Sequence, residues 1–201
     1  MSDTRILAIP NLNSSLEKTL ASPEWKQLEI DFNQAKRIVI FGNGGNLAVA
    51  DHAAIDISRL TDKLGLCPGS GILASSLIND KGHDKWLSTW VEISARGLSK
   101  DVLRKTLFIG ISSSGKSENV VSALNLASSM QSRCWLITAS SLKTKQSINF
   151  NFCKLELKEY HTAEVLTLLL IYQLIHSAGF DCPPISEASK DSAKTFDFQH
   201  K

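Results

Sequence analysis

The sequence predicts an α/β fold of three layers, in which helices cover both faces of a doubly wound, mostly parallel sheet of five strands. Two observations favour this fold. Short apolar runs alternate with longer segments of helical pattern along the chain. These runs are apolar throughout, as expected of strands that are covered on both faces. The 201 residues, 43% of them hydrophobic, suit a single domain over residues 1–201.

The elements are expected in the following order. Residues 1–36 form an N-terminal helical segment, because Ser22 is a good N-cap, Pro23 suits the first helical position and Glu24 suits the first turn. Strands are expected at 37–41, 71–75, 106–111, 134–139 and 152–157. Helices are expected from about residue 46, over 86–98, from 117 and from 162. Residues 180–201 are a polar C-terminal tail.

Composition excludes several classes of function. The net charge of +2 argues against direct binding of nucleic acid or of a membrane. The apolar run "VLTLLLIYQLI" is too short to cross a bilayer, and no run near the N-terminus has the length of a signal peptide. The four cysteines are scattered without a C-x-x-C pair and indicate reduced thiols, so a cytoplasmic location is expected.

Two loops that follow strands carry the functional signal, since ligands of such sheets bind beyond the carboxyl ends of the strands. "FGNGGN" follows the first strand and "ISSSGKS" the third. The first loop suggests a dinucleotide site, but the third glycine of that fingerprint falls at Leu47. No acidic residue ends the expected second strand, which runs into Ser75 and Ser76. A nicotinamide cofactor is therefore not expected.

The second loop matches the P-loop pattern G-x-x-x-x-G-K-[ST] over residues 110–117, "GISSSGKS". A P-loop enzyme also needs an Asp at the end of another strand to hold magnesium, and "CWLITA" and "FCKLEL" contain none. The third strand also continues to Ile111, which leaves a turn of only about four residues. A single phosphate suits this turn better, because a helix N-terminus favours an anion and hydroxyl donors surround it. These donors are Ser112, Ser113, Ser114 and Ser117.

Together these loops resemble those of the sugar isomerase (SIS) domain family. "FGNGGN" and "ISSSGKSENVVSAL" are similar to the G-N-G-G-S and S-T-S-G-x-S segments of its phosphoheptose isomerases, and the resemblance covers roughly residues 15 to 178. It implies a flavodoxin-like fold with a five-stranded parallel sheet. It also implies a homotetramer with sites between subunits. Relatives that associate with a replication-initiator protein make a protein partner a further option.

The resemblance implies a sugar phosphate as ligand. Ser112, Ser114 and Ser117 would hold the phosphate with help from Ser113. The residues that would contact the sugar are Asn43, Gly44 and Asn46 of the first loop, together with Asp80 in "LINDKGHDKW". Asp80, His83 and Asp84 are alternatively expected to cap the helix that begins near residue 85.

The catalytic pair of the family is altered in this chain. The phosphoheptose isomerases use a Glu after the first loop and a His on the last helix. Here Asp56 stands at the Glu position, four residues after His52, and the family histidine falls at or near Leu169. An active isomerase would therefore use Asp56 as the base, with His161 or Glu164 as the acid.

No cofactor is required, although zinc is an option because some family members bind it through these positions. His52, Asp56 and His161 would be the ligands. Three hypotheses remain open: a phosphosugar-binding module with a binding or regulatory role only, an active aldose–ketose isomerase, and a P-loop nucleotide binder.

Overall fold

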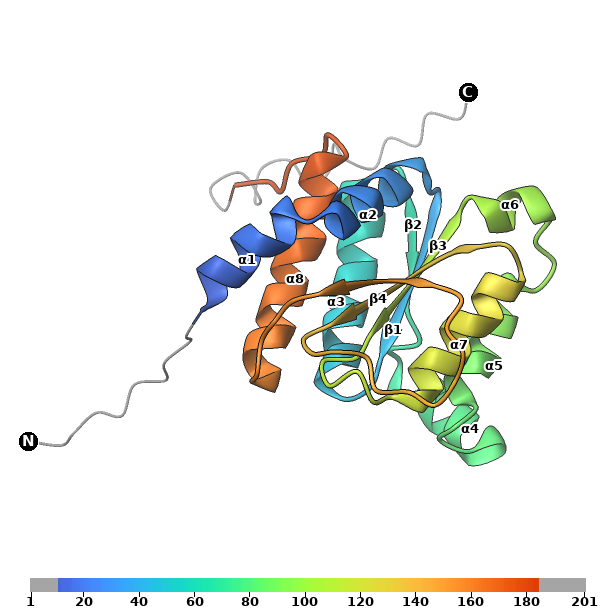
Figure 1. Ribbon diagram of the computed structural model, residues 1–201. Helices are drawn as coiled ribbons and strands as arrows, with labels where there is room; N and C mark the ends of the chain where they lie inside the picture. The colour runs from blue at the N-terminus through green and yellow to red at the C-terminus, as the bar shows by residue number, and fades with distance from the viewer. Residues whose placement is uncertain (1–10, 185–201) are drawn as a thin grey trace, which may run out of the picture.

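The structure is a computed structural model in which residues 11–184 are described, and these residues form a five-stranded parallel sheet between two layers of helices (Figure 1). The strand order is β2-β1-β3-β4-β5, which is the doubly wound order of flavodoxin-like proteins. The expected fold class is confirmed. The elements are α1 (Leu12–Ala21), α2 (Pro23–Gln34), β1 (Arg37–Gly42), α3 (Gly45–Leu60), β2 (Leu64–Leu66), α4 (Gly71–Lys81), α5 (Trp86–Ala95), α6 (Lys100–Arg104), β3 (Thr106–Ile111), α7 (Glu118–Ser129), β4 (Arg133–Thr138), β5 (Asn151–Lys154) and α8 (Tyr160–Ser177).

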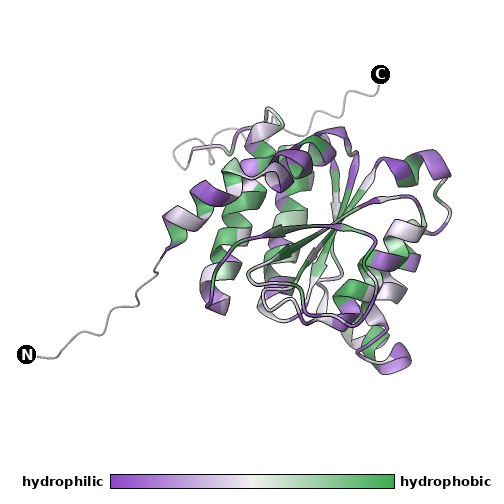
Figure 2. Cartoon of the chain, viewed as in Figure 1, coloured by the Kyte–Doolittle hydropathy of each residue, from purple (hydrophilic) through white to green (hydrophobic). Residues whose placement is uncertain are grey.

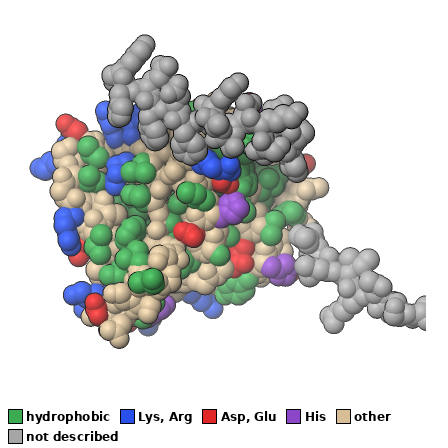
Figure 3. Space-filling view, turned by 180° about the vertical axis from the view of Figure 1, so that it is seen from behind, with side chains coloured by type: hydrophobic (Ala, Val, Ile, Leu, Met, Phe, Trp, Pro, Cys, Tyr) green, Lys and Arg blue, Asp and Glu red, His purple; other side chains and the backbone are tan. Residues whose placement is uncertain are grey.

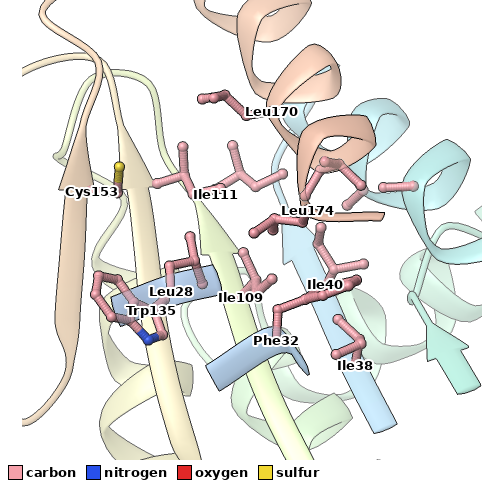
Figure 4. Packing of buried hydrophobic residues seen from close by; sticks show 14 of the residues in the cluster. Leu28, Phe32, Ile38, Ile40, Ile109, Ile111, Trp135, Cys153, Leu170 and Leu174 are labelled. Atoms are coloured by element: carbon pink, nitrogen blue, oxygen red, sulfur yellow. The ribbon is translucent and has the colours of Figure 1, made fainter. Parts of the chain in front are cut away.

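Each central strand sends alternate side chains into two separate cores, because successive side chains of a strand point to opposite faces. In β1, Ile38 and Ile40 belong to one cluster, whereas Val39 and Phe41 belong to the other. The first cluster lies under α2, α3 and α8, and Figure 4 shows Leu28, Phe32, Leu170 and Leu174 converging on the isoleucines of β1 and β3. Figure 2 shows the strands as mostly hydrophobic and the helices as mixed, which is the pattern expected of buried strands.

The N-terminal region contains two helices. Ser22 separates α1 from α2, and its side-chain oxygen accepts a hydrogen bond from the backbone N–H of Trp25 at 3.1 Å. The N-cap at Ser22 and the proline at the first helical position are therefore confirmed. Residues 1–10 and 185–201, which include most of the polar tail, lie outside the described residues.

The expected strand over 71–75 is wrong. These residues begin α4, and the second strand is the short segment "LGL" that precedes them, at the edge of the sheet. Ile72 is 85% exposed, so the apolar letters do not mark burial here. The case against a dinucleotide site still holds with the correct strand, because Leu66 is followed by Cys67 and Pro68, and not by a carboxylate.

The described cysteines fit the expectation of reduced thiols. All four are unpaired, and Cys134 and Cys153 are buried in β4 and β5. Burial raises the pKa of both of these thiols to about 12, which makes them unreactive. Within residues 11–184, no helix has the length and hydrophobicity that a bilayer span requires.

Candidate functional site

The serine loop, residues 112–117, connects the carboxyl end of β3 to α7. Gly115 has φ +64°, so a residue with a side chain would be strained at this turn. The first glycine of the P-loop pattern is not part of the loop. Gly110 lies inside β3, where an added Cβ would approach Val120 Cγ1 to 2.7 Å, so this glycine serves the packing of α7 on the sheet.

Two of the four serines direct their hydroxyls inward. Ser112 is buried and donates to Ser117 Oγ at 2.9 Å, and Ser113 is buried and donates to Asn46 Oδ1 at 3.1 Å. Because a hydroxyl has one proton, these bonds use the donors of Ser112 and Ser113. Ser114 and Ser117 are partly exposed and keep theirs. The first two serines thus fix the loop, and the second pair can donate to an anion.

Backbone groups add further donors to the serine loop. Within residues 11–184, the N–H groups of Ser113, Ser114 and Ser117 donate to no backbone carbonyl. Ser117 occupies the N-cap position of α7 without a side-chain capping bond. The loop therefore combines free N–H groups, hydroxyl donors and the N-terminus of a 12-residue helix, which together favour an anion.

A cavity of about 290 Å³ opens beside the serine loop. Ser113, Ser114 and Lys116 line it from the loop. Its other wall comes from the segments that follow β4 and β5, namely Ala139, Ser140, Lys143 and Leu157 to Tyr160. No motif in the sequence marks this second wall. It could still be expected, because every segment that follows a parallel strand reaches the same edge of the sheet.

The first loop is tied to the rest of the site by side-chain amides. Asn43 and Asn119 exchange hydrogen bonds, with Asn43 Nδ2 donating at 2.9 Å and Asn119 Nδ2 donating at 3.1 Å. Gly44 is exposed at the N-cap of α3, and Asn46 is buried in the first turn. Of the residues expected to contact the sugar, Asn46 bonds directly to the serine loop, whereas the amide of Asn43 is engaged by Asn119.

Asp80 lies apart from these contacts. It is exposed in the last turn of α4 and accepts a hydrogen bond from the neighbouring Asn79 side chain at 3.1 Å. The expected capping of the next helix by Asp80, His83 or Asp84 is wrong, because α5 has Lys85 at its N-cap and no side-chain capping bond.

Glu164 lies closer to the serine loop than the sequence indicates. Its carboxylate sits against the Cα of Gly45, where any Cβ would collide with it. Gly45 is the first residue of α3 and immediately precedes Asn46. The positive end of the α3 dipole stabilises a carboxylate at this place. Glu164 thus lies at the first turn of α3, which also contains Asn46, whereas His161 is exposed at the start of α8.

Asp56 is engaged by three side chains. Its Oδ2 accepts a hydrogen bond from Tyr172 Oη at 2.7 Å and lies 3.1 Å from His52 Nε2, and its Oδ1 accepts from Arg59 at 3.0 Å. Burial alone would raise the pKa of Asp56, but the bonds from Tyr172 and Arg59 outweigh it, and the pKa falls below its usual value. Burial and the Asp56 carboxylate raise the pKa of Tyr172 to about 12. A carboxylate held in this way is a weak base.

The residues considered for zinc do not form a metal site. His52 Nε2, the nitrogen that faces Asp56, also lies 2.9 Å from Tyr172 Oη. Within the described part of the chain, no three His, Cys, Asp or Glu side chains gather closely enough to hold a metal ion. Two protein ligands are fewer than the three or four that zinc sites use. The expected His52, Asp56 and His161 set therefore does not fit zinc.

The curated proteins that match this chain include phosphoheptose isomerases of several bacteria. No protein-family model matches the chain. The chain is 40% identical over 104 residues to phosphoheptose isomerase 1 of Campylobacter jejuni, a match that covers 49% of the chain and 52% of that protein. It is 32% identical over 120 residues to the phosphoheptose isomerase of Aliarcobacter butzleri, covering 55% and 59%. The matches thus span a little over half the length of these relatives.

Solved structures show the same fold. The phosphoheptose isomerase of Neisseria gonorrhoeae superposes with a TM-score of 0.67 at 22% identity, over 85% of this chain and 93% of that one. The Vibrio vulnificus NanR protein, complexed with ManNAc-6P, superposes with a TM-score of 0.56 at 19% identity, over 84% and 59%. At these identities the structural similarity establishes the architecture alone.

Proposed function

We propose that this chain, a member of the phosphoheptose isomerase-like group of the sugar isomerase (SIS) family, binds a small sugar phosphate. The observation that carries the proposal is the serine loop and its adjoining cavity. Ser114, Ser117 and the free backbone N–H groups supply donors for the phosphate. The cavity of about 290 Å³ is just below the range of roughly 300–1,000 Å³ that is typical of ligand sites, so a small ligand such as a monosaccharide suits it.

Binding without the family's isomerase chemistry is the function that the geometry supports best. Isomerisation needs a base that takes a proton from the carbon beside the carbonyl and an acid that protonates the carbonyl oxygen. Asp56 stands at the family's Glu position but is held by Tyr172, Arg59 and His52. Its lowered pKa reduces its strength as a base.

An active isomerase is the second candidate, and one contact favours it. The Glu164 carboxylate lies at the N-terminus of α3 against Gly45, the residue before Asn46, and Asn46 bonds to the serine loop. A carboxylate there stands beside the region in which we place the sugar. In this version Glu164 would move the proton between the two carbons, and Asp56 would have a structural role.

The decisive experiment compares binding and turnover in the same samples. Calorimetry with sedoheptulose 7-phosphate and with Mg-ATP tests the ligand class, and NMR of the sugar mixture tests isomerisation. We expect sedoheptulose 7-phosphate, and not Mg-ATP, to bind. Ser114→Ala should weaken this binding more than Lys116→Asn does. If Lys116→Asn weakens binding more than Ser114→Ala does, or if Mg-ATP binds and the sugar phosphate does not, the nucleotide-binding hypothesis is favoured.

The two candidates separate on turnover. No aldose product from wild-type protein supports a binding role. Product that disappears in Glu164→Gln and persists in Asp56→Asn supports the isomerase that uses Glu164. Product that disappears in Asp56→Asn, with sugar phosphate binding and thermal stability unchanged, would contradict the structural role of Asp56.

We also propose that the chain assembles into an oligomer, as the family resemblance implies. Large hydrophobic side chains are exposed on α3 and α8, with Ile55 62% exposed, Val165 53% and Leu169 41%. Figure 3 shows hydrophobic side chains on the face turned away from the viewer in Figure 1. Analytical ultracentrifugation tests this proposal: Val165→Glu should dissociate the assembly, and a wild-type monomer at micromolar concentration would refute it.

A further inference from the structure

Three lysines surround the cavity beside the serine loop. Lys116 comes from the loop itself, Lys143 from the connection between β4 and β5, and Lys158 from the segment before α8. Glu159 is the one acidic residue among the lining residues. Three lysines against one glutamate give this lining a local excess of positive charge, in a chain whose 22 basic and 20 acidic residues nearly balance.

None of these three lysines forms an ion pair within the described residues, although other lysines do. Lys154, four residues before Lys158, lies 3.5 Å from Glu156. Lysines without a carboxylate partner leave a net positive potential in the cavity. Such a potential attracts an anionic ligand.

Backbone hydrogen bonds hold the lysine-bearing segments at the cavity. The N–H of Lys143 donates to the carbonyl of Gly115 at 2.7 Å, and Ser140 Oγ donates to the carbonyl of Ser114 at 2.8 Å. The N–H of Leu157 donates to the carbonyl of Ala139 at 3.1 Å, which fixes the residue before Lys158. The wall opposite the serines is thus anchored to the loop that we assign to the phosphate.

One phosphate does not require all of this charge. The serine loop already offers hydroxyls, free N–H groups and a helix N-terminus, and Lys116 lies within it. Lys143 and Lys158 come from other segments and line the remainder of the cavity. These two lysines lie away from the phosphate loop, so the partner that suits their charges is a second anionic group on the same ligand.

We propose that the site prefers a sugar phosphate that carries a second anionic group, either another phosphate or a carboxylate. The first phosphate binds the serine loop, and Lys143 and Lys158 bind the second group. This inference rests on the proposed function and specifies the substrate class of the same site.

Calorimetry with matched ligands tests the inference. Sedoheptulose 7-phosphate and sedoheptulose 1,7-bisphosphate differ only in the second phosphate, and glucose 6-phosphate and 6-phosphogluconate differ in the oxidation of C1 from an aldehyde to a carboxylate. We expect the doubly anionic ligand of at least one pair to bind about tenfold more tightly, and the pair that responds identifies the second group. The preference should shrink as salt is raised, because exposed charges are screened.

Lysine variants show whether the proposed residues are responsible. Lys143→Gln and Lys158→Gln together should abolish the preference, so that the two ligands of each pair bind with affinities within about threefold of each other. Lys145→Gln is the matched control, since Lys145 is an exposed lysine of the same connection that does not line the cavity. It should keep the full preference.

The outcomes distinguish this inference from the proposed function. Equal affinity within both ligand pairs overturns the inference and leaves the proposed function standing. A full preference that persists in the Lys143→Gln, Lys158→Gln double variant also overturns it. If neither a monophosphate nor a doubly anionic sugar binds, the proposed function itself is wrong.

Discussion

Replacing Asp56 with Asn tests whether this carboxylate stabilises the folded protein. The side chain of Asp56 is 9% exposed and faces Arg59, His52 and Tyr172. Asn keeps the shape of the Asp side chain but removes its charge, and its N–H₂ group then faces side chains that themselves donate hydrogen bonds. Hydrogen bonds to charged groups contribute about 1.5–3 kcal/mol each, but Arg59 and His52 are half exposed and contribute less, so the total loss is about 2–4 kcal/mol.

Thermal and urea unfolding measure this loss. For a chain of this length, about 2–4 kcal/mol corresponds to a fall in Tm of roughly 5–15 °C. Tyr172→Phe removes the shortest bond and should lower the free energy of unfolding by about 1–2 kcal/mol. Because the two side chains contact each other, the double variant should lose less than the sum of the single losses.

The pH dependence of stability gives an independent check. The pKa of Asp56 is lowered in the folded state, so its stabilisation is fully present above the unfolded value of about 3.9 and is lost as the pH falls through the folded pKa. The difference in unfolding free energy between wild type and Asp56→Asn should therefore shrink below about pH 4. A difference that is absent at pH 7, or that grows in acid, would refute the structural role.

Further predictions concern one contact at the site and one in the core. Gly45→Ala should displace the Glu164 carboxylate while changing stability by less than about 1 kcal/mol, since Ala suits a helix and Glu164 can move. In calorimetry with sedoheptulose 7-phosphate, Gly45→Ala should then change the affinity by the same factor as Glu164→Gln does. Different factors would show that Gly45 does not act on the ligand through Glu164. Lys63→Met should cost about 2–4 kcal/mol in urea unfolding, because the buried ammonium donates to the carbonyls of Asn33 at 3.1 Å and Ala35 at 2.9 Å. A loss below about 1 kcal/mol would show that water replaces the ammonium at these carbonyls.

Most of the sheet could be predicted because its central strands are buried on both faces. After their first residues, Arg37 and Thr106, β1 and β3 are apolar to their ends, as expected of strands that helices cover on both sides. β2 has three residues at the sheet edge and is partly exposed, so it carries no such signal. The apolar run at 71–75 resembles a strand more closely than β2 does, but a run of five residues fits a strand or a helix equally well.

The serine loop could be predicted as part of the site, but its internal geometry could not. The sequence shows four serines, and only the structure shows that Ser112 and Ser113 donate inward. The proximity of Glu164 to Gly45 joins residues 119 positions apart through the docking of α8 near the start of α3. No local pattern contains that contact, because it depends on how two helices pack on one face of the sheet.

The P-loop pattern shows how the same letters can serve two architectures. In "GISSSGKS" the first glycine lies in β3 against α7, the second supplies a left-handed turn, and the helix begins only after the last serine, at Glu118. The lysine that completes the pattern lines the cavity beside Lys143 and Lys158. Lys116 therefore adds its charge to those of two other lysines at a small cavity, where we propose that a sugar phosphate binds in place of a nucleotide.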